Sequence, residues 1–323
     1  MRAAYAARQD QDDPLEGLVV GEIEPPTAPP GWVRVTVRAA ALNHHDLWSL
    51  RGVGLPSDRL PMVLGCDAAG VTEDGREVIV HAVVGDPAWT GDETLDPART
   101  LLSELHLGTF AEHVLVPARN VVDKAPELTF AEAACLPTAW LTAYRMLTTV
   151  GRVRAGDTVL VQGATGGVAG AAITLARLMG ARVAATSRSE AGRALAADLG
   201  AHEVLESGER LSGRADLVVE SVGQATWAHS LRSLRPGGSV VVCGATSGDA
   251  PPAELNRVFF RSLNVLGSTM GTRDELEALQ RALVTTGVRP RVEVIGGLDA
   301  VPTGLRRMAR GEIAGKLVVE PSV

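Results

Sequence analysis

The chain has 323 residues, of which 46% are hydrophobic and 21% charged, so it is long enough to bury the cores of two domains. Its formal net charge of -7 at pH 7 argues against a general electrostatic attraction to nucleic acid or to an anionic membrane surface. The sequence contains neither a secretory h-region nor a run of about 18 apolar residues, so we expect a cytoplasmic protein without a membrane span.

The first part of the chain is expected to form strands. After the proline-rich EPPTAPPG, Val33, Val35 and Val37 alternate with polar residues, which is the period of a half-buried strand. EVIVHAVVG and AEHVLVP are two further extended stretches. Strands without helical periods between them favour an antiparallel, partly barrel-like domain.

The pattern changes near Val121. TFAEAACLPTAWLTAYRMLTTVG is rich in helix formers, and Thr129 with Glu132 forms a possible capping box. Strand and helix signals then alternate: DTVLVQG, a helix to Met179, ARVAATS, a helix to Leu199, DLVVES, a helix to Leu234, SVVVCG and NVLGSTM. This alternation predicts an α/β domain with a doubly wound parallel sheet. The tail from about Val292 returns to short strand and turn signals and is expected to rejoin the first domain.

A glycine-rich segment follows the first of these alternating strands. GATGGVAGAAITLARLMG opens a helix directly after DTVLVQ, which is the context of a dinucleotide fingerprint. Gly163 can make the tight turn, and Gly166 and Gly167 let the backbone approach a pyrophosphate. The backbone amides and the helix dipole then favour the anion. The alternative is an ordinary glycine-rich turn between a strand and a helix.

The end of the second strand bears on the choice of coenzyme. NAD-specific sites place a carboxylate about 20 residues after the glycine loop, where this chain has Ser187 and Arg188. A guanidinium can hold a 2′-phosphate through two parallel hydrogen bonds, whereas a carboxylate would repel it. We therefore expect NADPH rather than NADH. The alternative for Arg188 is a solvated loop charge.

The chain resembles the medium-chain dehydrogenase/reductase superfamily, and more closely its zinc-independent, quinone oxidoreductase-like branch. The motifs that carry the resemblance are ALNHHDLWSLRG, LPMVLGCDAAG, GTFAEHVLVPARN, AACLPTAWLTAYRML, VQGATGGVAGAAITLARLMGA, LRPGGSVVVCGATSG and GEIAGKLVVEP. It implies a GroES-like, mostly β catalytic domain from residues 1–122 and 290–323 and a Rossmann domain from residues 123–289. It also implies a homodimer, formed by edge-to-edge pairing of the sixth Rossmann strands.

Zinc-dependent relatives hold catalytic zinc at positions that correspond here to Asn43, to Cys66 with Asp67, and to Thr138. An amide and a hydroxyl are poor zinc ligands, so we expect the catalytic zinc to be absent. Since His44, His45, Cys66 and Asp67 are capable ligands, a zinc-dependent alcohol dehydrogenase remains the enzymatic alternative.

Without a metal, the protein must stabilise the charge that hydride transfer leaves on a quinone, an enone or a related small carbonyl acceptor. By resemblance Asn43 faces the nicotinamide and is the first candidate for that role. His45 occupies the position of a relay hydroxyl and could donate a proton. The candidate catalytic residues are thus Asn43, His45 and Asp46. The alternative for His44 and His45 is that one is exposed and the other pairs with Asp46 for structural reasons.

The resemblance also implies a set of coenzyme contacts. They are Thr138, Thr142, Gly163, Ala164, Thr165, Gly166, Gly167, Val168, Ser187, Arg188, Val222, Gly223, Cys243, Gly244, Ala245, Met270, Gly271 and Lys316. Cys243 has no evident base partner and fits a small buried thiol better than a nucleophile. Lys316 either adds charge near the coenzyme or forms a surface salt bridge.

Two other enzyme classes are excluded by residue inventory. Short-chain reductases are marked by a Tyr-x-x-x-Lys pair. Neither Tyr5 nor Tyr144 is followed by a lysine at that spacing. A phosphate-loop NTPase needs Gly-Lys-Ser/Thr, which does not occur. A protein that binds NADPH without turning it over stays open, because fold alone does not establish catalysis.

Overall fold

The computed structural model describes residues 1–321. The chain divides into two compact units, one formed by residues 1–141 together with the segment from Met270 onward, the other by residues 142–269. Residues 123–141 and 270–289, which the sequence prediction assigns to the Rossmann domain, pack with the first unit.

The first unit is built mainly from strands. These are β1 (Arg2–Ala6), β2 (Leu18–Glu22), β3 (Trp32–Ala41), β4 (Met62–Val63), β5 (Asp67–Thr72), β6 (Glu77–Val80), β7 (Val83–Val84), β8 (Thr100–Leu101), β9 (His113–Pro117), β10 (Val121–Asp123), β17 (Val292–Val294) and β18 (Lys316–Val319). Its helices are α1 (His44–Leu50), α2 (Phe130–Ala134), α8 (Arg273–Thr286) and α9 (Val301–Ala309).

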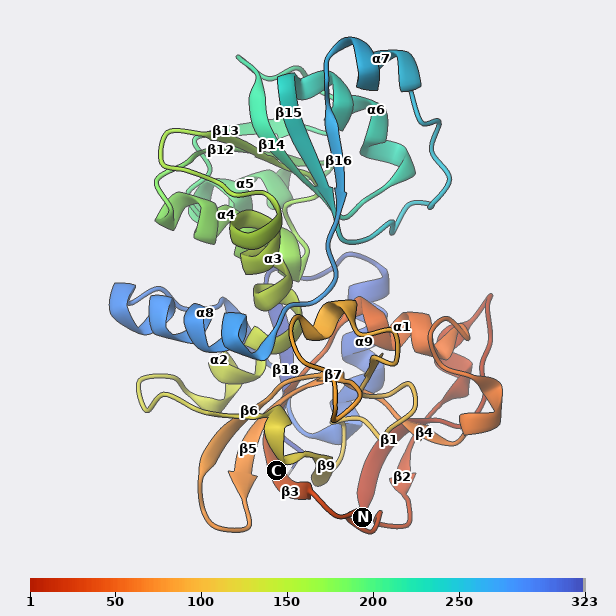
Figure 1. Ribbon diagram of the computed structural model, residues 1–323. Coiled ribbons are helices and arrows are strands. Elements are labelled where there is room, and N and C mark those ends of the chain that lie inside the picture. Colours follow the sequence, from red (N-terminus) through yellow and green to blue (C-terminus); the bar gives the residue numbers. More distant parts are fainter. Residues whose placement is uncertain (322–323) are drawn as a thin grey trace. The chain divides into compact units, whose positions relative to one another are not determined.

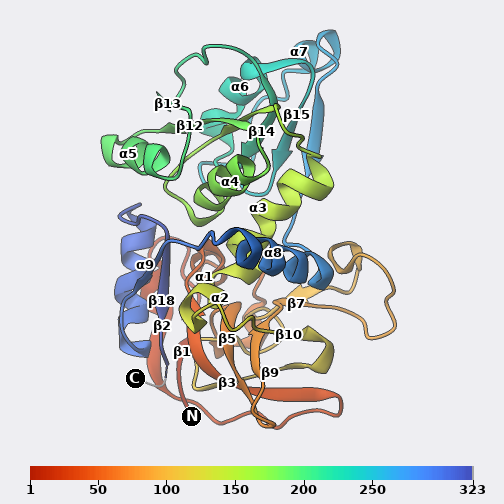
Figure 2. The same ribbon diagram turned by 90° about the vertical axis from the view of Figure 1, so that its left-hand side faces the viewer.

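The main sheet of this unit has the strand order β10-β6-β5-β3-β18-β17, and β9 also pairs with β3. The alternation in β3 is confirmed, since Val35 and Val37 are buried and Arg34 is exposed. The C-terminal strand β18, blue in Figure 2, pairs antiparallel with β3, so that Val318 lies opposite Ala41. The tail therefore rejoins the first unit as expected.

Helices α2 and α8, which lie outside the predicted first domain, contact residues of the first unit. Helix α2 packs against β3 and β5. In α8, the Gln280 side chain accepts a hydrogen bond from the Ala125 amide at 2.9 Å and donates one to the Asp123 carbonyl at 3.0 Å. Contacts of this kind join residues that are far apart in the sequence. The periodicity of nearby hydrophobic residues therefore cannot predict them.

The second unit alternates strands and helices. Its strands are β11 (Thr158–Val161), β12 (Arg182–Ser187), β13 (Glu203–Glu206), β14 (Ala215–Glu220), β15 (Leu234–Val242) and β16 (Asn264–Gly267). Its helices are α4 (Gly167–Leu178), α5 (Glu190–Asp198), α6 (Gln224–Ser233) and α7 (Leu255–Phe260), and α3 (Leu141–Arg145) begins at the unit boundary.

The strands of the second unit form a parallel sheet in the order β13-β12-β11-β14-β15-β16. Helices α4 and α5 pack against β11, β12 and β13, and α6 packs against β14 and β15 (Figure 1). Numbered from β11, this order is 3-2-1-4-5-6, which is that of the Rossmann fold. The predicted doubly wound sheet is therefore confirmed.

Several details differ from the expectation. The helical stretch after Thr129 is not one regular helix, because π-helical turns at Leu136–Trp140 and Met146–Val150 alternate with α2 and α3. Pro137 lies in the first π-helical turn and lacks the amide that a regular α-helix would use. The capping box at Thr129 is present. Strand β13 and helix α9 have no counterpart in the expected elements.

Each unit has its own apolar core. Val35, Leu42 and Phe110 belong to the core of the first unit, and Leu160, Val218 and Val240 to that of the second. Among residues 1–321, no helix combines the length and the apolar character that a membrane crossing requires.

Candidate active site

The glycine loop lies at the carboxyl end of β11. Gly163 has φ 73°, and a Cβ on it would come within 2.9 Å of the Val222 side chain, so this position requires glycine. Gly166 is the N-cap of α4, and a Cβ on it would meet only the Gly163 carbonyl oxygen, at 4.0 Å. Space is therefore open in front of the first amides of α4. In the strand order, β11 and β14 flank the switch point where Rossmann folds bind their ligands.

A buried polar network supports the loops around this point. Glu220, at the end of β14, is fully buried and accepts hydrogen bonds from the amides of Val222 and Gly223 at 2.8 and 3.0 Å. Gln162, just before the glycine loop, donates to Ser230 at 3.0 Å and accepts from Thr186 at 2.6 Å. The network thus joins the carboxyl ends of β11, β12 and β14. Sequence reasoning missed it, and its only signal was a polar residue at the end of each apolar strand.

Two arginines, rather than one, lie near the end of β12. Ser187 is buried and Arg188 is exposed. Arg193, in the first turns of α5, donates a hydrogen bond from Nη1 to the Ser187 carbonyl at 3.2 Å. Sequence reasoning missed Arg193, although its position five residues after Arg188 was a usable signal.

The other expected coenzyme residues are divided between the units. Ala164, Thr165, Gly167 and Val168 complete the loop and the first turn of α4, and Thr142, Cys243, Gly244 and Ala245 also belong to the second unit. Burial raises the pKa of the Cys243 thiol to about 12, so the thiol is neutral near pH 7. Thr138, Met270, Gly271 and Lys316 belong to the first unit.

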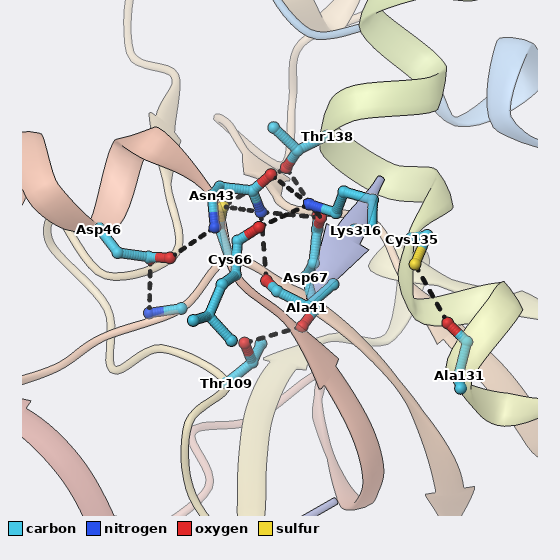
Figure 3. Close-up of polar contacts among 12 residues, drawn as sticks. Ala41, Asn43, Asp46, Cys66, Asp67, Thr109, Ala131, Cys135, Thr138 and Lys316 are labelled. Atoms are coloured by element: carbon cyan, nitrogen blue, oxygen red, sulfur yellow. Dashed lines mark hydrogen bonds and ion pairs between the residues drawn. The ribbon is translucent and has the colours of Figure 1, made fainter. Parts of the chain in front are cut away.

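Within the first unit, a compact group of polar side chains surrounds Asp67, and we call it the Asn43 cluster (Figure 3). It consists of Asn43, Asp46, Cys66, Asp67, Thr138 and Lys316. Both carboxylate oxygens of Asp67 are engaged: Oδ1 accepts from the Thr138 hydroxyl at 2.6 Å, and Oδ2 accepts from Asn43 Nδ2 at 2.8 Å. Cys66 Sγ lies 3.4 Å from the Thr138 hydroxyl oxygen.

Lys316 is not part of a surface salt bridge, which corrects that alternative. Only 4% of the residue is exposed, and its ammonium lies 3.4 Å from Asp67 Oδ2. It reaches this position because β18 pairs with the end of β3, directly before Asn43. No sequence motif links Lys316 to Asn43, because the two residues are 273 positions apart.

The two acid–base candidates on α1 do not pair with each other. Asp46 is fully buried and accepts from the amides of Asn43 and Gly65 at 2.8 and 3.1 Å, which closes a capping box at the start of α1. His45 Nε2 lies 3.2 Å from the hydroxyl oxygen of Ser103, a buried residue with φ 69° that sequence reasoning missed. Burial lowers the pKa of His45, so its imidazole is neutral near pH 7.

The Asp46 carboxyl should make the stability of the protein depend on pH. Burial raises its pKa from 3.8 to about 7. A raised pKa in the folded state stabilises the fold at low pH, and this contribution is lost as the pH rises toward 7. Relative to Asp46→Asn, the wild-type free energy of unfolding should fall by at most about 1.4 kcal/mol per pH unit between about pH 4 and pH 7. Urea unfolding of both proteins across this range measures it, and a constant difference would contradict it.

Comparisons with known proteins agree with both units. Residues 29–127 match the family model described as alcohol dehydrogenase GroES-like domain, and residues 167–285 match the one described as zinc-binding dehydrogenase. A 2-methylene-furan-3-one reductase of Solanum lycopersicum is 33% identical over 300 residues, which are 90% of this chain and 71% of that protein.

Two further similarities extend over nearly the whole chain. The spectinabilin polyketide synthase system protein NorB of Streptomyces orinoci is 33% identical over 320 residues, which are 94% of this chain but 14% of NorB, so the chain spans a small part of that relative. The crystal structure of an NAD-dependent alcohol dehydrogenase superposes with a TM-score of 0.91 at 34% identity, covering 99% of each chain. The chain therefore belongs to the medium-chain dehydrogenase/reductase superfamily, with a GroES-like and a Rossmann domain, and is an NAD(P)H-dependent oxidoreductase.

Proposed function

We propose that this oxidoreductase uses NADPH to reduce a conjugated carbonyl compound, an enone or a quinone, without a catalytic metal. The observation that carries the proposal is the Asn43 cluster, in which a buried ammonium and an amide stand where a zinc site would need anionic or imidazole ligands. The conjugated acceptor is further supported by the tomato relative, whose named substrate has a C=C bond conjugated to a ketone.

The donor set of the cluster does not fit a zinc ion. Asn43 and Thr138 both point hydrogen-bond donors at Asp67, and Lys316 brings a positive charge against the same carboxylate. Burial beside Asp67 and Asp46 raises the pKa of the Cys66 thiol well above its ordinary value, which disfavours the thiolate that binds zinc. Among the described residues, no group of three or more His, Cys, Asp or Glu side chains could hold a metal ion.

The preference for NADPH is supported by the two arginines at the end of β12. Arg188 is exposed, and Arg193 is held against the Ser187 carbonyl at the same strand end. Two guanidinium groups there can pair with a 2′-phosphate, and the residue directly after Ser187 is Arg188 rather than a carboxylate that would accept hydrogen bonds from the ribose hydroxyls.

Replacing Arg188 by Asp should therefore invert the coenzyme preference. We expect the affinity for NADPH to fall by about 10- to 100-fold through loss of a charge-assisted hydrogen bond, and NADH binding to stay equal or improve. Fluorescence titration of both coenzymes measures this. Arg154→Asp, the same charge change before the amino end of β11, is the matched control and should leave both affinities unchanged. Equal losses in the two variants would show a general charge effect instead.

The residues of the first unit would then support the chemistry. A bound NADPH would supply the hydride for the β-carbon of the acceptor, which would leave negative charge on the carbonyl oxygen. We assign the stabilisation of that negative charge to the second amide N–H of Asn43, because its contacts inside the cluster are long, 3.3 Å to the Ala41 carbonyl oxygen and 3.7 Å to Cys66 Sγ. The proton for the α-carbon comes from water, and we assign its relay to His45, whose neutral imidazole accepts one proton as it passes on another and lies 3.2 Å from the Ser103 hydroxyl.

The test of the proposal is an acceptor panel. NADPH consumption is measured with enones, quinones, saturated aldehydes and saturated ketones, and NADP⁺ reduction with alcohols. Turnover of the conjugated acceptors alone supports the proposal. Turnover of alcohols and saturated aldehydes would favour a zinc-dependent alcohol dehydrogenase, and tight NADPH binding without consumption of any acceptor would favour a non-catalytic protein.

We also propose that the protein is a homodimer joined through β16. This strand lies at the edge of the parallel sheet, and Val265 in it is 49% exposed. The neighbouring α7 exposes Phe259 and Phe260, at 60% and 80%. An apolar sheet edge of this kind is usually covered by pairing.

Val265→Asp should convert the dimer to a monomer, because it places a charged side chain on the apolar shared edge of both protomers. Light scattering coupled to size exclusion gives the mass of the wild-type protein and of the variant. Lys in place of the exposed Val294, in the first unit, is the control and should leave the mass unchanged. A monomeric wild type, or a dimer that survives Val265→Asp, would contradict the proposal.

A further inference from the structure

The ammonium of Lys316 is fully used inside the Asn43 cluster. It donates to the Leu42 carbonyl at 2.7 Å and to Asn43 Oδ1 at 2.6 Å, and it lies 3.4 Å from Asp67 Oδ2. An ammonium has three N–H groups, and these three acceptors match them. Lys316 is therefore satisfied without any external ligand, and a buried charge of this kind is tolerated only when it is paired in this way.

This contact also fixes which way the Asn43 side chain faces. Since Lys316 is a pure donor, it holds the amide oxygen of Asn43, so the amide nitrogen must point the other way. That nitrogen donates to Asp67 Oδ2 at 2.8 Å and lies 3.7 Å from Cys66 Sγ (Figure 3). The amide hydrogens thus face the two atoms of the cluster that could best bind a cation.

We propose that Lys316 is a positioning residue that supplies the positive charge of the cluster from within and keeps divalent metal ions out. The inference rests on the proposed metal-free function and deepens it. It also moves Lys316 from the set of coenzyme contacts to the cluster around Asp67. A metal ion at Asp67 and Cys66 would lie within a few ångströms of the ammonium, and that repulsion is strong in a buried site.

Removal of the ammonium should therefore create a metal site once a second thiol is present. The test compares Asn43→Cys, which keeps Lys316, with Asn43→Cys/Lys316→Met, and uses Co²⁺ as the probe. Cobalt bound by thiolates has a strong charge-transfer absorption, so binding is observed directly. We expect the double variant to bind Co²⁺ at least about 100-fold more tightly than Asn43→Cys.

The second measurement is the affinity of Lys316→Met for NADPH. This affinity should stay within about 2-fold of wild type. If Lys316 instead contacted a coenzyme phosphate, loss of that contact would lower the affinity by about 10-fold or more. If Lys316→Met does not fold, Lys316→Gln, which keeps a donor for Leu42 or Asn43, replaces it in both measurements.

Two results would overturn the inference: equal cobalt affinity of Asn43→Cys with and without Lys316, or a loss of NADPH affinity of about 10-fold or more in the folded Lys316 variant. Neither measurement uses turnover. Failure of the proposed reaction in the acceptor panel would therefore be distinguishable from failure of this inference.

Discussion

Gly166→Val should abolish measurable coenzyme binding while leaving the protein folded. A Cβ at Gly166 meets only the Gly163 carbonyl oxygen, at 4.0 Å, and the residue has φ −73°, so valine fits the apo chain. The added side chain would instead fill the space in front of the first amides of α4, where a pyrophosphate must approach. Loss of two charge-assisted hydrogen bonds corresponds to an NADPH affinity at least about 100-fold weaker.

Titration with NADPH and thermal unfolding together check this prediction. Gly213→Val is the matched control, because a Cβ there has no neighbour within 4 Å and Gly213 lies in a loop of the same unit. The control should bind NADPH as the wild type does. The stability of Gly166→Val should fall by no more than about 1 kcal/mol, which is the usual cost of a poor N-cap. Unchanged NADPH affinity in Gly166→Val would contradict a coenzyme site at this loop.

Asp67→Ala should be among the most destabilising single substitutions in the first unit. It removes the partner of the buried Lys316 ammonium and leaves the donors of Asn43 and Thr138 without their acceptor. Breaking a buried ion pair from one side costs about 3–5 kcal/mol, because the remaining charge is uncompensated. Urea unfolding measures the loss.

An exposed ion pair in the same unit provides the comparison. Glu293 pairs with Arg307 at 2.7 Å, and its side chain is 51% exposed, so Glu293→Ala should cost at most about 1 kcal/mol. Adding Lys316→Met to Asp67→Ala should restore part of the lost stability, since it removes the stranded charge. A similar cost for Asp67→Ala and Glu293→Ala would show that the cluster does not hold a buried charge pair.

The Rossmann unit was the most predictable part of the molecule. Strands β11, β12 and β14 are short apolar runs, and each is followed by a helix, so local periodicity is enough to find them. Strand β13 was not predicted, because Glu203–Glu206 has a glutamate at each end and shows no clear hydrophobic alternation. Helix α9 was not predicted, because it contains Pro302 and Gly304, both weak helix formers. Packing explains Gly304, where a Cβ would lie 2.6 Å from the Leu42 and Ile295 side chains.

The polar sites were less predictable. The resemblance pointed to Asn43 and Thr138, and the structure brings both to Asp67. The position of Lys316 depends on the register between β18 and β3, and that of Ser103 on a left-handed backbone conformation in a loop. Neither can be read from residues near them in the sequence. The network of Glu220 and Gln162 likewise depends on which strands are neighbours in the sheet.

Metal-stripped protein offers the most direct test of the central claim. The rate of NADPH oxidation with a conjugated enone is measured after chelation, before and after zinc is added back, together with the metal content of each sample. Full turnover at a metal content far below one ion per chain, unchanged by zinc, is the predicted result. A rate that disappears on chelation and returns with zinc would contradict reduction by a metal-free site.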